Sequence, residues 1–549
     1  MGTAETPFPN QPPLYADRNL YTDDVALKDA LVREGGAWAE NAVAEWGATL
    51  GTAAVLALGD TANRHPPELA THDARGERID EVRFHPAWHE LMRLATTAGV
   101  HCLPWNDARP GAQVARGAMV HLHAQVENGT QCPLTMTYAS VPALRHAAAA
   151  FPQLERDWLP KILARDYDAR AVPVAAKRSA LIGMGMTERQ GGSDVRSNRT
   201  RAVPAEDGAV RLTGHKWFFS APQCDAHLVL AQDDVGLGCF LLPRVLPDGG
   251  KNTIRINRLK DKLGNRSNAS AEVEFDAALA WPIGEGGRGI ATILEMVQHT
   301  RLDCVLATAG MMRAALARAI HHARHRVAFG RTLATQPLMQ EVLADIALES
   351  EAATALALRL ARAYDAPEGH PERALARLVT PAAKYWVCKR GPALAAEAME
   401  ALGGNGYDEE SGLPRLYREM PLNSIWEGSG NVMCLDVVRA ARREPDGVAA
   451  LAALLGEARN VNSVYDVFVA ALLRELAALA DETAVARRIA QGIATAVAAS
   501  LLLRNAPAPV ADAYCATRLA PVAFGGGAFG AMPLRGGDAA PIVARALPD

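Results

Sequence analysis

The sequence predicts an α+β protein, mainly helical, in which a small β domain lies between two helical domains and a helical extension ends the chain. Apolar residues recur at helical spacing from about residue 20 to 180 and again after Gly289, whereas a period of two prevails between about 181 and 285. The chain shows no βαβ alternation of the kind that builds a doubly wound sheet. We expect domains at residues 1–180, 181–285, 286–445 and 446–549.

Each predicted element rests on its own periodicity. Leu27, Leu31 and Trp38 indicate helices in the first domain. In the β domain, Ala271, Val273 and Phe275 alternate with acidic residues, which predicts a strand with one buried face. The apolar runs 228–231 and 239–242 predict strands buried on both faces. The third domain opens with one long apolar helical stripe, formed by Leu302, Leu306, Ala309, Met312, Leu316 and Ile320.

Composition excludes several classes of protein. The formal net charge of −4 and pI of about 6.4 give the chain no overall attraction to polyanions or anionic lipid. The 8 cysteines are scattered singly, which is typical of reduced thiols rather than disulfides or zinc clusters. The longest apolar run, Ile493 to Leu503, is too short to span a bilayer, and no secretory signal is visible. We expect a cytoplasmic protein without a membrane partner.

Two segments of the predicted β domain carry groups suited to a polar heterocycle. The first is Met184-Gly-Met-Thr-Glu-Arg-Gln-Gly-Gly-Ser193, and the second is Gly214-His-Lys-Trp-Phe-Phe-Ser220. Their glycines allow backbone N–H groups to approach a ligand, and their hydroxyls can hydrogen-bond a ring edge. Taken singly, each segment is more typical of a polar turn beside a strand.

Two later segments carry charged groups. Arg326-Val-Ala-Phe329-Gly330, with Gln336 further on, offers a guanidinium whose fork geometry suits a diphosphate, although a plain helix-end arginine is the alternative. The segment Ile425-Trp-Glu-Gly-Ser-Gly-Asn431 offers the Glu427 carboxylate, which in isolation is typical of a surface turn. His321 and His325 form a helical pair without a third ligand, so we expect no metal site.

Taken in order, these segments resemble the motifs of the acyl-CoA dehydrogenase family. The match covers roughly four fifths of the chain and includes Lys262 to Phe275 and Ala401 to Tyr407. The resemblance implies a homotetramer that binds FAD and an acyl-CoA or related thioester. It also implies that Glu427 is the base that removes the proton alpha to the thioester, with Ile425 and Trp426 desolvating it and raising its pKa. Glu295 is the alternative base.

The resemblance further assigns roles at the ligand sites. Arg301 is expected to line the acyl-CoA cavity, and Arg326 and Gln336 to meet the FAD of a neighbouring subunit. The residues expected to bind FAD are Met184, Met186, Thr187, Gly192, Ser193, Phe218, Phe219, Ser220, Arg326, Phe329, Gln336, Glu400, Gly403, Gly404, Ile425, Ser429, Gly430 and Asn431.

Several departures from the family pattern resemble its AidB branch, which is associated with alkylation damage and binds duplex DNA. They include Arg83 to Leu91, the Thr-Glu-Arg and Phe-Phe-Ser variants, and the C-terminal extension. From residue 436 onward the chain has 11 Arg, no Lys and 11 acidic residues, so a DNA site would need clustered arginines. The candidates form two ridges: Arg439, Arg442 and Arg443, and Arg487, Arg488 and Arg518.

Three functions are therefore open at this stage. The chain is a working thioester dehydrogenase, or a DNA-binding protective flavoprotein with little turnover, or a retained fold without catalysis.

Overall fold

The computed structural model describes residues 10–147, 151–479, 483–520, 529–531 and 539–548. These residues fall into two compact units, each assembled from separate stretches of the chain. The helical unit comprises Met1–Leu56, Pro110–Gln125 and Cys304–Asp549, and the mixed unit comprises Ala57–Arg109 and Val126–Asp303. The predicted α+β class, with a small β domain between helical domains in chain order, is confirmed.

The mixed unit contains a seven-stranded sheet that curls back on itself. The strand order is β3-β5-β4-β6-β7-β9-β8, with further pairings of β3 with β6 and of β5 with β9. Most neighbours are antiparallel, whereas β6 pairs in parallel with β3 and β4. The strands are β3 (Ile182–Gly185), β4 (Arg201–Pro204), β5 (Val210–Ser220), β6 (Ala226–Asp233), β7 (Gly236–Pro243), β8 (Ile254–Leu259) and β9 (Ser270–Ile283).

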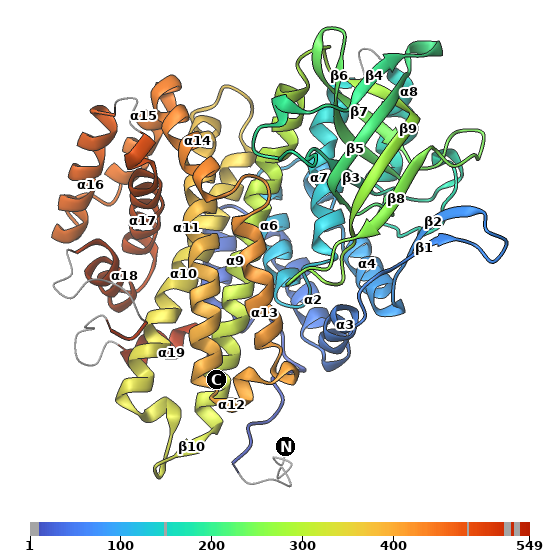
Figure 1. Ribbon diagram of the computed structural model, residues 1–549. Coiled ribbons are helices and arrows are strands. Elements are labelled where there is room, and N and C mark those ends of the chain that lie inside the picture. The colour runs from blue at the N-terminus through green and yellow to red at the C-terminus, as the bar shows by residue number, and fades with distance from the viewer. Residues whose placement is uncertain (1–9, 148–150, 480–482, 521–528, 532–538, 549) are drawn as a thin grey trace. The chain divides into compact units, whose positions relative to one another are not determined.

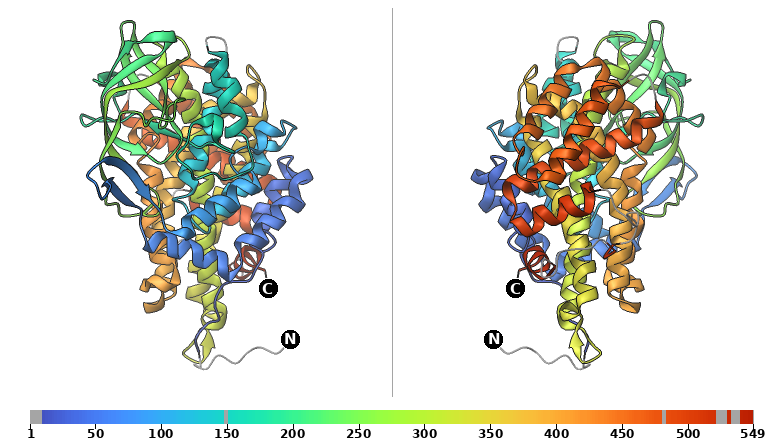
Figure 2. Two further views of the ribbon diagram at one scale, coloured as in Figure 1. Left: turned by 90° about the vertical axis from the view of Figure 1, so that its right-hand side faces the viewer. Right: turned by 90° about the vertical axis from the view of Figure 1, so that its left-hand side faces the viewer.

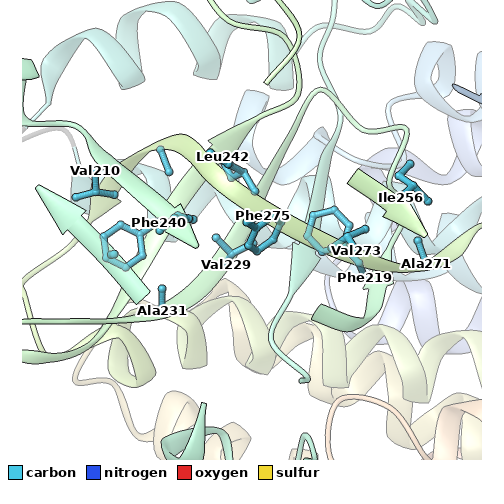
Figure 3. Packing of buried hydrophobic residues seen from close by; sticks show 14 residues of the cluster. Val210, Phe219, Val229, Ala231, Phe240, Leu242, Ile256, Ala271, Val273 and Phe275 are labelled. Carbon is cyan, nitrogen blue, oxygen red and sulfur yellow. The ribbon is translucent and has the colours of Figure 1, made fainter. Parts of the chain in front are cut away.

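The core of this sheet follows the predicted patterns. The runs 228–231 and 239–242 are buried throughout in β6 and β7, as expected for strands covered on both faces. In β9, Ala271, Val273 and Phe275 are buried, and they join Phe219, Val229 and Phe240 in one apolar cluster (Figure 3).

The rest of the mixed unit is largely helical, with one element that the sequence did not predict. Its helices include α4 (Pro86–Ala98), α5 (Leu103–Asn106), α7 (Gln131–Ala147) and α8 (Pro152–Ile162). The expectation of an all-helical first domain is wrong, because β1 (Glu68–His72) and β2 (Arg78–Arg83) form an antiparallel hairpin. Strand β2 is mostly charged and β1 contains only Leu69 and Ala70 as apolar residues, so the period of two is carried by only a few apolar residues. Leu69 and Val82 pack against the sheet core.

Long helices build the helical unit. They are α9 (Gly289–His325), from residue 304 onward, α10 (Pro337–Asp365) and α11 (Pro371–Ala401), joined by α1 (Val25–Arg33), α2 (Glu40–Leu50) and α6 (Ala112–Ala124). Helix α3 (Ala53–Arg64) begins in this unit. The stripe predicted for α9 is confirmed, since all of its members are buried. Shorter helices complete the frame: α12 (Gly404–Tyr407), α13 (Leu413–Glu419) and α14 (Gly430–Arg443).

The predicted extension folds as helices that pack on α10, α11 and α14, within the same unit (Figures 1 and 2). These are α15 (Pro445–Gly456), α16 (Ser463–Ala477), α17 (Ala486–Asn505), α18 (Ala508–Tyr514) and α19 (Ala539–Ala546), with a π-helical turn at Cys515–Leu519. In the described part of the chain, no single helix meets the length and hydropathy of a membrane span. One bent pair, Ala37–Leu50 with Ala53–Arg64, meets them by length and composition.

Buried ion pairs fix the extension to α10. Arg518 is almost fully buried, and its guanidinium pairs with Asp345 and with Glu349 at 2.9 Å. These carboxylates raise the pKa of Arg518 although burial opposes them. The prediction that Arg518 contacts DNA is therefore wrong, because its donors are already committed inside the protein. Arg545 on α19 adds a second link, to Glu351 at 3.0 Å.

We predict that Arg518→Ala destabilises the helical unit, because it leaves the buried Asp345 without its cation and leaves Glu349 with only the longer contact to Arg390, at 3.4 Å. Breaking such a pair costs about 3–5 kcal/mol, whereas an exposed pair contributes at most about 1 kcal/mol. The matched control is Arg488→Ala, since Arg488 forms an exposed pair with Glu475 at 3.2 Å. Urea unfolding and limited proteolysis after residue 505 measure the effect. Equal stability of the two variants would contradict this account of the docking.

Candidate active site

Glu427 lies in a strained loop between a 3₁₀ turn (Met420–Ser424) and α14. Its φ is +56°, in the left-handed region that costs a residue with a Cβ roughly 1–2 kcal/mol. Such strain persists only where the surroundings enforce it, and it is typical of functional sites.

Helix α11 supplies part of that enforcement. Lys384 is buried, and its Nζ donates to the carbonyl oxygens of Trp426 and Gly428, both at 2.8 Å. Hydrogen bonds from charged donors contribute roughly 1.5–3 kcal/mol each, so these two together outweigh the cost of the left-handed residue. Ser424 Oγ also donates to the Cys388 carbonyl at 3.1 Å. The loop is thus tied to α11 on both sides of Glu427.

A second set of bonds ties the loop to α9. The Trp426 indole N–H donates to Asn423 Oδ1 at 2.9 Å, and Asn423 Nδ2 donates to Thr308 Oγ1 at 2.9 Å. Thr308 in turn donates to the Cys304 carbonyl at 2.7 Å. Because Asn423 and Thr308 are buried, these bonds fix the indole and the backbone next to Glu427.

The two apolar neighbours of Glu427 differ in exposure. Trp426 is half-buried, and Ile425 is 63% exposed. The desolvation of Glu427 by these residues stays a prediction.

The N-terminus of α14 follows directly, and the extension reaches it. Ser429 occupies the N-cap position without a capping side-chain bond. Arg487, at the start of α17, donates to Asn431 Oδ1 at 2.9 Å, and its guanidinium lies 5.9 Å from the Tyr385 ring centroid. The predicted ridge of Arg487, Arg488 and Arg518 is therefore not formed: Arg487 faces α14, Arg488 pairs with α16, and Arg518 is buried.

Other predicted FAD ligands of this unit gather at its opposite end. Val327–Ala328 (β10) and Arg331–Thr332 (β11) form a hairpin whose tip, Phe329, is 98% exposed. Arg326 donates to the Asn10 carbonyl at 2.6 Å, and Gln336 Nε2 donates to the Ala328 carbonyl at 2.9 Å.

The loop before α12 belongs to the same end, since Asn405 bonds to Gln11, next to Asn10. Glu400, Gly403 and Gly404 are exposed here, and Gly403 has a φ of +62°. Lys384 and Glu400 are 16 residues apart on α11, which at about 1.5 Å per residue separates them by roughly 24 Å. One chain thus does not bring these residues to Glu427.

In the mixed unit, the loop after β3 is built around a buried ion pair. Glu188 Oε1 lies 2.9 Å from Lys216 Nζ, and Glu188 also accepts from the backbone N–H groups of Arg199 and Thr200. Against the effect of burial, Lys216 and these donors lower the pKa of Glu188 to about 2, while burial lowers the pKa of Lys216 to about 8. The pair anchors a loop whose other end is exposed.

The remaining predicted ligands of this unit divide into exposed and buried positions. Gly192 and Ser193 are exposed, Met186, Thr187 and Ser220 are half-buried, and Phe218 is exposed, with Lys260 Nζ 4.7 Å from its ring centroid. The prediction for Phe219 is wrong, because its ring lies in the apolar core of the sheet against His227 and Phe275 (Figure 3). Strand β5 is irregular between Lys216 and Phe219, and this irregularity leaves Phe218 exposed while Phe219 is buried. Met184 is buried within β3, and Arg301 is buried on α9.

The residues present fit FAD. A Cβ on Gly192 would lie 2.3 Å from Thr187 Oγ1, so the absence of a side chain at Gly192 leaves room for the Thr187 hydroxyl at the exposed end of the loop. Hydroxyls and backbone N–H groups there suit a flavin ring, and the N-terminus of α14 suits a diphosphate. In the described residues, no group of three or more His, Cys, Asp or Glu could hold a metal ion.

Sequence reasoning missed Lys384, Thr308, Asn423 and the contact of Arg487. Only tertiary contacts distinguish Lys384 from a solvated helix lysine, and no local pattern signals it.

Comparisons with known proteins identify the family. Family models match residues 10–169 (adaptive response protein AidB, N-terminal domain), 183–278 (acyl-CoA dehydrogenase, middle domain) and 287–441 (acyl-CoA dehydrogenase, C-terminal domain). AidB of Escherichia coli (strain K12) is 52% identical over 511 residues, covering 93% of this chain and 94% of AidB.

Two solved structures are similar over nearly the whole chain. Caenorhabditis elegans ACDH-11 in complex with C11-CoA has a TM-score of 0.82 at 28% identity, covering 100% of this chain and 94% of that one. Bd2924 in its apo form has a TM-score of 0.80 at 30% identity, covering 91% of this chain and 100% of that one. The chain belongs to the acyl-CoA dehydrogenase family, whose members depend on FAD, and within it to the branch that contains AidB.

Proposed function

We propose that this protein oxidises an acyl-CoA or related thioester to its α,β-unsaturated form, with Glu427 as the base. The observation that carries the proposal is the loop of Glu427: a carboxylate in a strained left-handed conformation, held by bonds to α9 and α11. Bound FAD would supply the acceptor for the β-hydride, and Glu427 takes the α-proton. The α C–H bond would give its proton to Glu427, and the β C–H bond would give its hydride to FAD. No other reactant is therefore needed for this half-reaction.

The substrate class is proposed from the chemistry of the base and from one relative. A carboxylate can remove a carbon acid proton where an adjacent carbonyl acidifies it, as a thioester carbonyl does, and ACDH-11 is solved with C11-CoA. Arg301, buried on α9, stays the predicted contact for this substrate.

FAD would be held by several groups of residues. In the mixed unit these are the exposed loop at Gly192 and Ser193 and the exposed Phe218. In the helical unit they are the start of α14 at one end, and Arg326 with Gln336 at the other. We propose that each end serves a different flavin in a homotetramer, because roughly 24 Å of α11 separates them.

Exposed apolar side chains support this assembly. Phe329 at the hairpin tip, Leu338 on the following helix and Tyr407 on α12 are 98%, 77% and 82% exposed. Large apolar residues with so little cover are typical of surfaces that a partner buries. A second copy would cover them by the same contact that brings Arg326 to its flavin.

Duplex DNA binding stays a prediction. Of the six candidate arginines, Arg439, Arg442 and Arg443 on α14 are exposed, and Arg439 lies 3.7 Å from Asp436. Acidic Glu444 and Asp446 follow directly, so any attraction to phosphate at this helix end is diluted.

The first prediction concerns the base. Glu427→Gln keeps the size of the side chain but cannot accept the proton, so flavin reduction by C11-CoA should fall at least about 100-fold with FAD content unchanged. Anaerobic stopped-flow absorbance measures the rate. Glu295→Gln is the matched control and should reduce flavin at close to the parent rate. If Glu295→Gln loses reduction and Glu427→Gln keeps it, the base is Glu295.

A second prediction tests the proposed assembly through Phe329. Because this side chain is already exposed, Phe329→Glu should leave the fold of the chain intact but place a charge in the subunit contact. We expect a smaller particle by light scattering, and loss of FAD with it. A variant of parent mass and parent FAD content would exclude the hairpin from the contact.

A third prediction assigns Arg487 to the cofactor site. Loss of its bond to Asn431 should weaken FAD binding about tenfold, the change that a charged hydrogen bond of roughly 1.5 kcal/mol produces. Arg487→Ala and Arg488→Ala remove equal charge from adjacent positions, so Arg488→Ala controls for general electrostatics. The affinity for FAD is measured by titrating the apo-proteins of both variants with FAD. If Arg487→Ala binds FAD as tightly as Arg488→Ala, the extension does not support the cofactor site.

A further inference from the structure

We propose that Lys384 is a positioning residue for the reaction, acting on Glu427 through the backbone on either side of it. The inference rests on the proposed function and extends it to a residue of α11 that no motif includes. Its basis is a single geometric fact: one buried ammonium bonds to the carbonyls of both Trp426 and Gly428, at 2.8 Å each.

The geometry explains why a glutamate can occupy this conformation. Glutamate in the left-handed region relaxes readily unless its flanking peptide groups are fixed. Lys384 fixes the carbonyl before Glu427 and the one after Gly428, and Gly428 itself has a φ of +99°. The backbone therefore sets the direction of the Cα–Cβ bond of Glu427, because the carbonyls of Trp426 and Gly428 are held at Nζ of Lys384.

The chemistry of the donor matters as well as its position. A tetrahedral ammonium can bond two carbonyls at once while remaining on a flexible stem, and neither acceptor here is a carboxylate. These two carbonyls do not neutralise the positive charge of Lys384. That charge therefore remains beside the loop of Glu427, which must be ionised to act as a base. A neutral side chain of equal length offers neither the bonds nor the charge.

The other contacts of the loop make Lys384 separable from general stability. Ser424 is bonded to Cys388, and Asn423 and Trp426 are bonded to each other and through Thr308 to α9. All of these bonds involve residues that precede Glu427 in the sequence. They should therefore still hold residues 423 and 424 and the Trp426 indole when Lys384 is replaced. Loss of Lys384 should then free residues 426 to 428 and leave the rest of the fold in place.

The test uses Lys384→Met, which removes both donors, and Lys384→Arg, which restores charge and donors. Lys389→Met is the matched control, because it is the same change on the same helix at an exposed position. In the holoenzyme with saturating C11-CoA, we expect Lys384→Met to slow flavin reduction about 10- to 30-fold with less than about a twofold change in thioester affinity. Lys384→Arg should recover most of the rate, and Lys389→Met should match the parent.

Two further measurements separate this role from a merely structural one. In a double-mutant cycle, adding Lys384→Met to Glu427→Gln should cause no additional loss, because Lys384 acts only through Glu427. Hydrogen exchange of the peptide spanning 422–432, which needs no substrate, should be faster in Lys384→Met than in the parent or Lys389→Met.

The outcomes distinguish the two proposals. If Glu427→Gln keeps the parent rate, or C11-CoA does not reduce the parent flavin, the proposed function fails, and the exchange experiment still tests the clamp. If Glu427→Gln is impaired but Lys384→Met reduces flavin at the parent rate, the inference about Lys384 is overturned. Parent-like exchange in residues 422–432 of Lys384→Met overturns it independently, as does an additive loss in the double variant.

Discussion

The rigid length of α11 is the constraint on which the account of the site depends. A helix cannot shorten, so residues at Lys384 and at Glu400 stay roughly 24 Å apart along one element. The reactive loop is tied to the first position, and the exposed glycines and the Phe329 hairpin lie with the second. The apolar exposure at that second end follows from the same geometry, because no described residue of the helical unit covers it. The length of this one helix thus links the proposed function to the proposed assembly.

Buried hydrogen bonds and ion pairs position the two loops that carry the candidate site residues. In the mixed unit, the Glu188–Lys216 pair anchors the loop that presents Gly192. In the helical unit, Lys384 and Thr308 anchor the loop that presents Glu427. Both loops have one buried, fully bonded side and one exposed side, which is how a folded chain keeps an open site rigid. The extension contributes in the same manner, since Arg518 fixes it to α10 and Arg487 links it to the start of α14.

Much of the fold could be predicted from periodicity, because the period reports which faces are buried. The double-sided burial of 228–231 and 239–242 and the stripe on α9 are confirmed. The β1–β2 hairpin was missed because its strands carry few apolar residues. Motifs located Glu427 and Gly192, but they could not separate Phe218 from Phe219, which needed the register of β5. Nor could they show that Arg518 is buried or that Lys384 holds the loop, because those facts depend on contacts between distant segments.

The central claim is that each flavin is served by the Glu427 end of one subunit and the hairpin end of another, and subunit complementation tests it most directly. A chain carrying Glu427→Gln and a chain carrying Phe329→Glu, each inactive alone, would be co-expressed with different tags and the mixed particles purified. Because a mixed pair contains one site with both ends intact, thioester-driven flavin reduction should return to about a quarter of the parent level under random pairing. If mixed particles form and show no more reduction than either variant alone, both ends serve the same flavin within one chain and the account is contradicted.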